Sequence, residues 1–233
     1  MITIESLSNL NNIFKLPRVK IFMNEVVEIM SNNSQNEKQN GNLIITTPGI
    51  FLLLKKMFKK NNTIINSISF IDLTAIHVSK DKISFQSETT KIRVSTPQAS
   101  QLGTFAYFIK QVLFPVSLCP ISLNFDSNTS HQVNPSSFPY EPQDIFYDRF
   151  LSCIMKYEIS HIPPLTFQYP NISNNYNNGI FLIKKEMLSN SLFQPLMLCL
   201  AFEDQIKEIE INTDISLSKL LPYCSSFISF NKF

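Results

Sequence analysis

Tryptophan is absent from the 233-residue chain, and glycine occurs only four times. The phosphate-binding patterns G-x-x-x-x-G-K-[ST] and G-x-G-x-x-G need clustered glycines, and neither occurs, nor does the zinc-binding pattern H-E-x-x-H. The three histidines, His77, His131 and His161, have no cysteine or serine at the spacing of a catalytic motif. These absences predict a protein that is not an enzyme and that holds no cofactor and no metal.

Cysteines are few and widely spaced. Cys119, Cys153, Cys199 and Cys224 form no C-x-x-C pair and no cluster with histidine, which predicts reduced thiols in an intracellular compartment. The N-terminal sequence lacks the basic and continuous apolar regions of a signal peptide. The most apolar stretch, residues 102–123, is interrupted by one lysine and two prolines, so we expect a cytoplasmic protein with no membrane-spanning segment.

The charge is unevenly distributed along the chain. Residues 1–115 hold 13 Lys+Arg and 7 Asp+Glu, a balance of +6, whereas residues 116–233 hold 7 and 11, a balance of −4. This asymmetry predicts two units with different surfaces, of which the first is the better suited to phosphates or acidic lipids.

The first unit, residues 1–115, has the pattern of a β-rich domain. Residues 4–14 have apolar side chains at helical spacing and predict a short amphipathic helix. Seven segments with strand-like composition follow, the second and third joined by a Pro-Gly turn, and they cover residues 18–30, 42–47, 50–55, 63–73, 74–80, 82–88 and 91–96. Residues 98–114 then show helical periodicity up to Pro115. Seven strands followed by one helix is the element order of a pleckstrin-homology-like β-sandwich with a C-terminal helix.

The rest of the chain predicts a linker and a small α/β segment. Residues 116–142 are rich in proline, serine and asparagine and lack periodicity, so we expect a linker. Within residues 143–233, helices are predicted over residues 143–157 and 189–204, and strands over residues 164–169 and 179–185. The sequence IKEIEINTD, residues 206–214, loosely matches the core of one leucine-rich repeat. The fold class is therefore α+β, and the single repeat-like match is weak evidence because three or more repeats are normally needed to bury a continuous core.

A lysine-rich stretch, KKMFKKNN at residues 55–62, is the candidate functional site. In the pleckstrin-homology interpretation it connects the third and fourth strands, where it would attract anionic lipid electrostatically and could insert an apolar pair. The alternative is a solvated hairpin whose phenylalanine folds back onto the core. Nucleic acid is not expected as a partner, because most aromatic residues fall on apolar faces. The candidate lipid-binding residues are Lys55, Lys56, Met57, Phe58, Lys59 and Lys60, with Lys15, Arg18 and Lys20 as further contributors to the field.

Several segments together resemble the N-terminal region of the CARMIL family of actin-regulating scaffolds. They include IESLSNLNNIFKLPRVKIFMNEVVEIM, NLIITTPGIFLLL, SISFIDLTAIHV, FIKQVLFPVSLCP, FYDRFLSCIMKYEISHIPPLTFQY and SLFQPLMLCLAFEDQIKEIEIN. The resemblance covers nearly the whole chain in order and spacing, although few residues are individually diagnostic. It implies a divergent pleckstrin-homology domain, a linker and the cap and first unit of a leucine-rich-repeat array.

The resemblance implies membrane-proximal control of actin assembly. It carries the expectation of non-specific binding to acidic phospholipids at the plasma membrane or actin cortex, and of actin-regulatory partners such as capping protein and class I myosin. The chain departs from the family in having almost no repeat array and no counterpart of the capping-protein-binding motifs. Residues 32–41 also lack a K-x-[KR]-x-R inositide motif, which argues against headgroup-specific recognition. The alternative function is a protein-binding module that self-associates, for example as a homodimer, without lipid activity.

Overall fold

The structure analysed is a computed structural model of the chain. It describes residues 19–30, 39–54, 63–115, 117–126, 145–157, 176–177, 180–184, 193–203 and 206–212. The predicted helix over residues 4–14 and the predicted strand over residues 164–169 lie outside these ranges.

The largest element is an eight-stranded, mostly antiparallel sheet with the strand order β4-β3-β2-β1-β7-β6-β5-β8. The seven strands predicted in the first 115 residues are all present. The strands are β1 (Ile21–Ile29), β2 (Gln39–Thr46), β3 (Gly49–Leu54), β4 (Thr63–Ser69), β5 (Ala75–Val78), β6 (Lys82–Gln86), β7 (Lys91–Ser95) and β8 (Ser122–Phe125).

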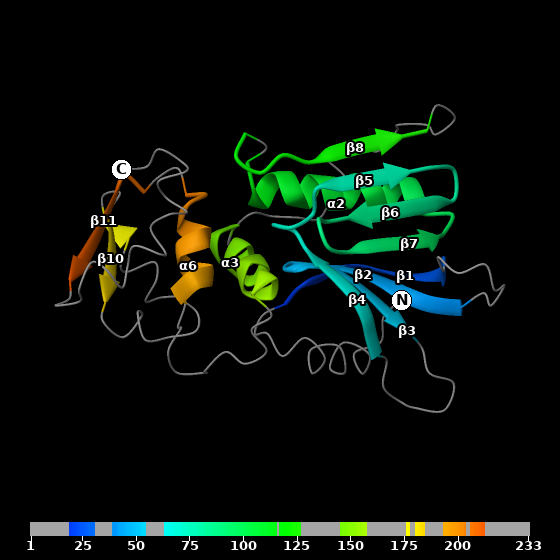
Figure 1. Ribbon diagram of the computed structural model, residues 1–233, viewed down its shortest axis with the longest axis horizontal. Coiled ribbons are helices and arrows are strands. Elements are labelled where there is room, and N and C mark those ends of the chain that lie inside the picture. Colours follow the sequence, from blue (N-terminus) through cyan, green and yellow to red (C-terminus); the bar gives the residue numbers. More distant parts are fainter. Residues whose placement is uncertain are drawn as a thin grey trace.

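The sheet bends into two layers between β1 and β7. These strands pair at only two positions, Glu28 with Ser95 and Ile29 with Val94, whereas β1 and β2 pair along almost their full lengths. Figure 1 shows the result, in which β1 to β4 form one group of strands and β5 to β8 form the other. Alternating apolar residues of both layers, such as Leu43 and Phe85, face the shared core.

Helix α2 (Ala99–Leu113) covers one side of this arrangement. Its apolar face packs on β5 and β6, and Phe105 also contacts Phe22 of β1 with the two rings edge to face and 5.7 Å between their centroids. The helix approaches the sheet closely at Gly103, where an added Cβ would lie 2.5 Å from Val78 Cγ2. Its last helical residue is Leu113, two residues before Pro115, as the sequence predicts.

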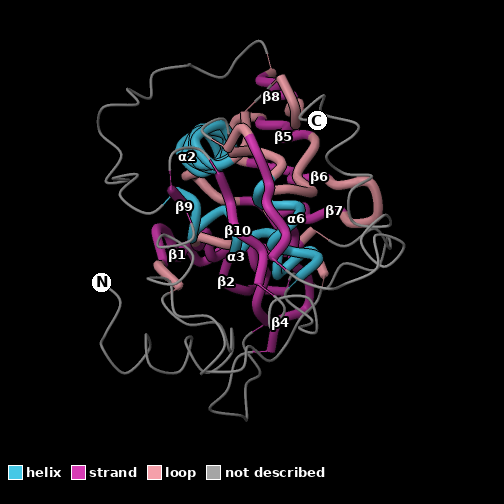
Figure 2. Tube along the Cα trace, turned by 90° about the vertical axis from the view of Figure 1, so that its left-hand side faces the viewer, coloured by secondary structure: helices cyan, strands magenta, loops and turns pink. Residues whose placement is uncertain are grey.

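The remaining elements form a smaller α/β part. Helices α3 (Ile145–Lys156) and α6 (Phe193–Leu200) lie between the large sheet and a three-stranded sheet with the order β11-β10-β9 (Figures 1 and 2). Its strands are β9 (Tyr176–Asn177), β10 (Ile180–Lys184) and β11 (Glu208–Asn212). Strands β10 and β11 run parallel with α6 between them in the chain, so they form a β-α-β unit. The predicted helix at 143–157 and the strand at 179–185 are confirmed within about two residues.

One apolar core connects the two parts. Side chains of α3 and α6, such as Phe150 and Leu196, belong to the same buried cluster as those of the large sheet and α2. At the junction, Phe114 and Phe202 pack edge to face with 5.0 Å between ring centroids. The β10-α6-β11 unit therefore shares a buried core with α3, α2 and the large sheet.

The prediction of a linker without regular structure over residues 116–142 is wrong for residues 122–125. Strand β8 pairs in parallel with β5, the Ser122 N–H donates to Thr74 O at 3.0 Å, and the Asp126 N–H donates to Val78 O at 3.0 Å. Strand β5 would otherwise be an edge strand with unpaired backbone groups, and β8 satisfies them. The second strand also begins earlier than the predicted residue 42, because β2 already starts at Gln39.

Candidate functional site

Two of the three connections in the β1–β4 layer, those between β1 and β2 and between β3 and β4, begin at the same end of that layer. Gly41 of β2 lies opposite both Val27 and Leu54, and Leu54 lies opposite Thr63. The described ends that flank residues 31–38 and residues 55–62 are therefore neighbours along one rim of the sheet. We call this rim the loop end; it consists of the ends of β1 and β3 and the beginnings of β2 and β4.

Apolar side chains are exposed near the loop end. A register shift in the β3–β4 pair puts Leu52 opposite Asn66 and Leu53 opposite Ile64, so Ile65 is the extra residue of a β-bulge. Ile65 is 45% exposed, and Met30, which follows β1, is 36% exposed. Isolated exposed apolar residues are common on protein surfaces, but these two lie on the rim that carries the lysine-rich stretch.

Of the nine candidate lipid-binding residues, the structure describes only Lys20. The other eight lie outside the described residues, namely Lys55, Lys56, Met57, Phe58, Lys59, Lys60, Lys15 and Arg18. Their position in space is therefore known only through the strands that flank them.

Lys20 lies at the opposite end of the layer from the loop end. Its backbone N–H donates to Thr47 Oγ1 at 3.1 Å, and Thr47 stands at the far end of β2 from Gly41. At about 3.3 Å per strand residue, this places Lys20 roughly 20 Å from Leu54, well beyond the Debye length of about 8 Å at physiological salt. Its Nζ is also 3.9 Å from Asp148 Oδ2. The strand register therefore separates Lys20 from the described strand ends that flank residues 55–62.

A second basic surface lies on the outer face of the β5–β8 layer. The exposed residues Lys82, Lys91 and Arg93 alternate with the buried residues of β6 and β7, so all three cations are on one face of the sheet. The alternation in KISFQ and KIRVS predicts this face, but sequence reasoning did not single it out as a charged surface.

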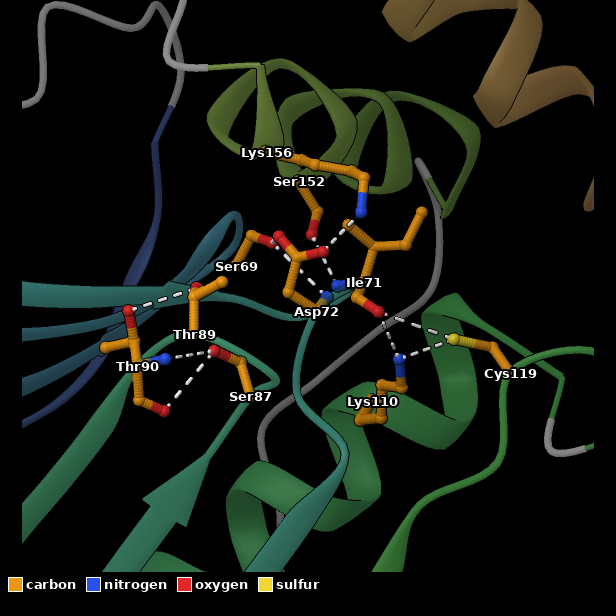
Figure 3. A network of polar contacts seen from close by, with 10 residues as sticks. All are labelled: Ser69, Ile71, Asp72, Ser87, Thr89, Thr90, Lys110, Cys119, Ser152 and Lys156. Atoms are coloured by element: carbon orange, nitrogen blue, oxygen red, sulfur yellow. Dashed lines mark hydrogen bonds and ion pairs between the residues drawn. The ribbon is translucent and has the colours of Figure 1, made fainter.

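A network of polar contacts surrounds the turn between β4 and β5 (Figure 3). The Ser69 hydroxyl donates to Asp72 Oδ2 at 2.6 Å, and Lys156 Nζ of α3 pairs with Asp72 Oδ1 at 2.5 Å. Between these residues, the Ile71 N–H donates to Ser152 Oγ of α3 at 3.2 Å. The turn therefore anchors α3 to the large sheet.

The same turn contacts α2 on its other side. Lys110 Nζ of α2 donates to Ile71 O at 3.1 Å, so both backbone groups of Ile71 are bonded to helix side chains. The Lys110 ammonium also donates to Cys119 Sγ at 2.8 Å and lies 4.9 Å from the centre of the Phe114 ring. The sequence did not predict this network. A lysine on the buried face of a helix interrupts the apolar pattern, but the sequence does not show which groups it contacts.

The two lysines of the network have opposite pKa shifts. Burial lowers the pKa of Lys110, and the nearby Cys119 opposes this only partly. Burial also acts to lower the pKa of Lys156, but the hydrogen bond and the negative charge of Asp72 outweigh it and raise that pKa. In this network Asp72 favours the charged form of Lys156, whereas burial disfavours the charged form of Lys110.

Arg149 of α3 makes a further junction. Its Nε donates to Leu113 O at the C-terminal end of α2, and its Nη1 pairs with Glu203 Oε1, just after α6. A cation at the end of a helix satisfies a carbonyl that has no partner within the helix.

Among the described residues no group of three or more His, Cys, Asp or Glu is placed to hold a metal ion. None of the described helices is long and apolar enough to cross a membrane.

Comparisons with known proteins do not assign a family. No family model matches the chain, and no curated protein matches it. Among the solved structures that match is "The hSac2 domain from human phosphoinositide phosphatase Sac2", with a TM-score of 0.38 and 7% identity. That match covers 60% of this chain and 98% of the other. A TM-score of this size supports no argument about the fold or activity of this chain.

Proposed function

We propose that the protein is a membrane-recruitment and scaffolding module, with a pleckstrin-homology-like domain followed by a leucine-rich-repeat cap and first repeat. The order of seven strands and a covering helix supports the first part. The parallel β10-α6-β11 unit supports the second, because such a unit is the building block of a repeat array. The resemblance to the CARMIL family extends the proposal to actin assembly at the cell cortex, with capping protein and class I myosin as partners.

The observation that carries the lipid-binding proposal is the position of the lysine-rich stretch at the loop end. Leu54 and Thr63 pair with each other and flank residues 55–62. The segment that connects β3 to β4 therefore starts and ends at the loop end, and it contains four lysines. Each lysine near an anionic leaflet contributes about 1 kcal/mol, so four together give roughly 4 kcal/mol of unspecific attraction. Met57 and Phe58 would add an apolar pair for the interface, and Ile65 is an exposed apolar residue two positions after the start of β4.

The experiment that tests this proposal is sedimentation of the purified chain with phosphatidylserine vesicles. The test variant changes Lys55, Lys56, Lys59 and Lys60 to glutamate. We expect wild-type binding that falls with salt, as unspecific electrostatic attraction does, and no binding by the test variant.

A matched control separates the lysine-rich stretch from net charge. It changes four other exposed lysines to glutamate, and therefore alters the net charge by the same amount; these are Lys80, Lys82, Lys91 and Lys207. We expect this control to keep most of its binding. Equal loss in both variants would mean that overall charge, or the second basic surface that includes Lys82 and Lys91, attracts the membrane as much as the lysine-rich stretch does.

The alternative function, self-association without lipid activity, has its own supporting observation. Strand β11 is at the end of the three-stranded sheet, next only to β10 among the described strands. An edge strand offers backbone groups to a further strand, so it suits pairing with another chain. Light scattering tests this by measuring the mass of the wild-type protein at two concentrations. A dimer that forms as concentration rises, in a protein that does not sediment with vesicles, would favour the alternative.

A further inference from the structure

Lys110 and Cys119 form a pair of nucleophilic side chains in direct contact. The distance between Lys110 Nζ and Cys119 Sγ is 2.8 Å, and both groups contact Ile71 O, at 3.1 Å from the nitrogen and 3.5 Å from the sulfur. Figure 3 shows the amine, the thiol and the carbonyl pointing toward one another from α2, the segment after it and the β4–β5 turn. The lipid-binding proposal makes no use of this pair.

Burial favours an uncharged amine. Lys110 is fully buried, which removes the water that would stabilise an ammonium ion, whereas the ring of Phe114, with its centroid 4.9 Å from the nitrogen, acts in the opposite direction. Burial is the largest influence on its pKa and lowers it, which increases the fraction of neutral amine at a given pH. A neutral amine has a free lone pair and is a nucleophile, whereas the ammonium ion is not.

Exposure differs between the two partners. Cys119 is half-buried and so is partly in contact with solvent, whereas Lys110 has no exposed surface. Cys153 and Cys199 are both buried. Among the described cysteines, Cys119 is thus the one that combines solvent access with a lysine amine at contact distance.

We propose that Lys110 and Cys119 form a reversible covalent cross-link when the protein meets hydrogen peroxide. The peroxide oxidises the Cys119 thiol by two electrons to a sulfenic acid and is itself reduced to water. The Lys110 amine attacks the sulfenic sulfur, so a sulfur–nitrogen bond forms and the sulfur–oxygen bond breaks. The oxygen leaves with the hydroxyl proton and one amine proton as a second water, and a sulfenamide with two hydrogens fewer than the reduced protein remains.

The cross-link ties α2 covalently to the segment that leads into β8. Lys110 is in the last turn of α2, and Cys119 is three residues before β8. A thiol reductant reverses the reaction by attacking the sulfur and releasing the amine. This inference is independent of lipid binding, because neither residue lies on the loop end.

Peptide mapping of peroxide-treated wild-type protein tests the proposal. Trypsin cleaves the unmodified chain after Arg93, Lys110 and Arg149, so residues 94–110 and 111–149 appear as separate peptides. The cross-linked chain instead yields residues 94–149 as one peptide, uncleaved at Lys110 and lighter by two hydrogens. Cys119 is the only cysteine in that peptide, so a disulfide within it cannot cause the same mass change.

We expect the joined peptide after peroxide treatment, its loss on adding dithiothreitol, and its absence from Cys119→Ser. In Lys110→Met the sulfenic acid has no amine to trap it, so we expect it to be captured by dimedone instead. The proposal is overturned if wild-type Cys119 goes to sulfinic acid, stays a thiol, or labels with dimedone as fully as in Lys110→Met. The wild-type result stands whether or not either variant folds.

Discussion

The hydrogen bond between α3 and the β4–β5 turn makes a sharp prediction about how the two parts of the chain are joined. Ser152 is fully buried, and its Oγ accepts the Ile71 N–H at 3.2 Å. The substitution Ser152→Ala removes only this oxygen and leaves a backbone N–H without a partner in a buried junction. We therefore expect a loss of stability larger than that of an ordinary serine to alanine change.

The size of the effect follows from two opposing terms. An unsatisfied buried N–H costs about 1–3 kcal/mol, and alanine in place of serine within a helix returns about 0.5 kcal/mol. The net loss in the free energy of unfolding is about 0.5–2.5 kcal/mol, equivalent to a fall of roughly 1–10 °C in Tm for a chain of this size.

Ser100 of α2 provides the matched control. Its Oγ is buried and has no hydrogen-bond partner in the described structure, so Ser100→Ala changes helix propensity without orphaning a donor. Urea unfolding of both variants compares a buried serine that accepts the Ile71 N–H with a buried serine that has no hydrogen-bond partner among the described residues. We expect Ser100→Ala to be neutral or slightly stabilising; a Ser152→Ala variant of equal stability to it would refute the proposed anchoring of α3.

Three further predictions concern stability. Gly103→Ala places a methyl group against Val78, which we expect to lower the free energy of unfolding by about 1–3 kcal/mol. The higher helix propensity of alanine offsets about 1 kcal/mol of this loss. In a Val78→Ala background we expect urea unfolding to show a smaller loss. The folded-state pKa of Lys110 is lowered, so its burial penalty is present below that pKa and is relieved as pH rises toward the unfolded pKa. Wild-type stability relative to Lys110→Met is therefore expected to rise with pH on the alkaline side, and a gap that is constant with pH would contradict this. The folded-state pKa of Lys156 is raised, so the stability that Lys156 contributes is present below its unfolded-state pKa and is lost as pH rises through its folded-state pKa. We expect Lys156→Gln to lack this loss of stability at alkaline pH. A variant whose stability has the same pH profile as wild type would refute the prediction.

The strands and helices followed closely from local patterns. In KISFQ and KIRVS, strict alternation placed Ile83, Phe85, Ile92 and Val94 on the buried face. Pro115 predicted the end of α2, because proline cannot continue a helix. These features depend on neighbours in sequence, so sequence alone was sufficient for them.

Long-range features could not be predicted in the same way. Strand β8 forms because β5 has an open edge beside it, and the composition of residues 116–142 does not reveal that edge. The buried position of Lys110 depends on Ile71 and Cys119, which belong to separate segments that only the fold brings together. Lys20 was grouped with the lysine-rich stretch because both are basic and belong to the same predicted domain. The strand register puts Lys20 at the end of the layer opposite to the loop end.

Vesicle binding at two salt concentrations tests the central claim most directly. Wild-type protein and the Lys55/Lys56/Lys59/Lys60→Glu variant are sedimented with phosphatidylserine vesicles at low and at physiological salt. The account predicts wild-type binding that is stronger at low salt, and no binding by the variant at either salt. Wild-type protein that stays in the supernatant at low salt, or a variant that binds as well as wild type, would contradict it.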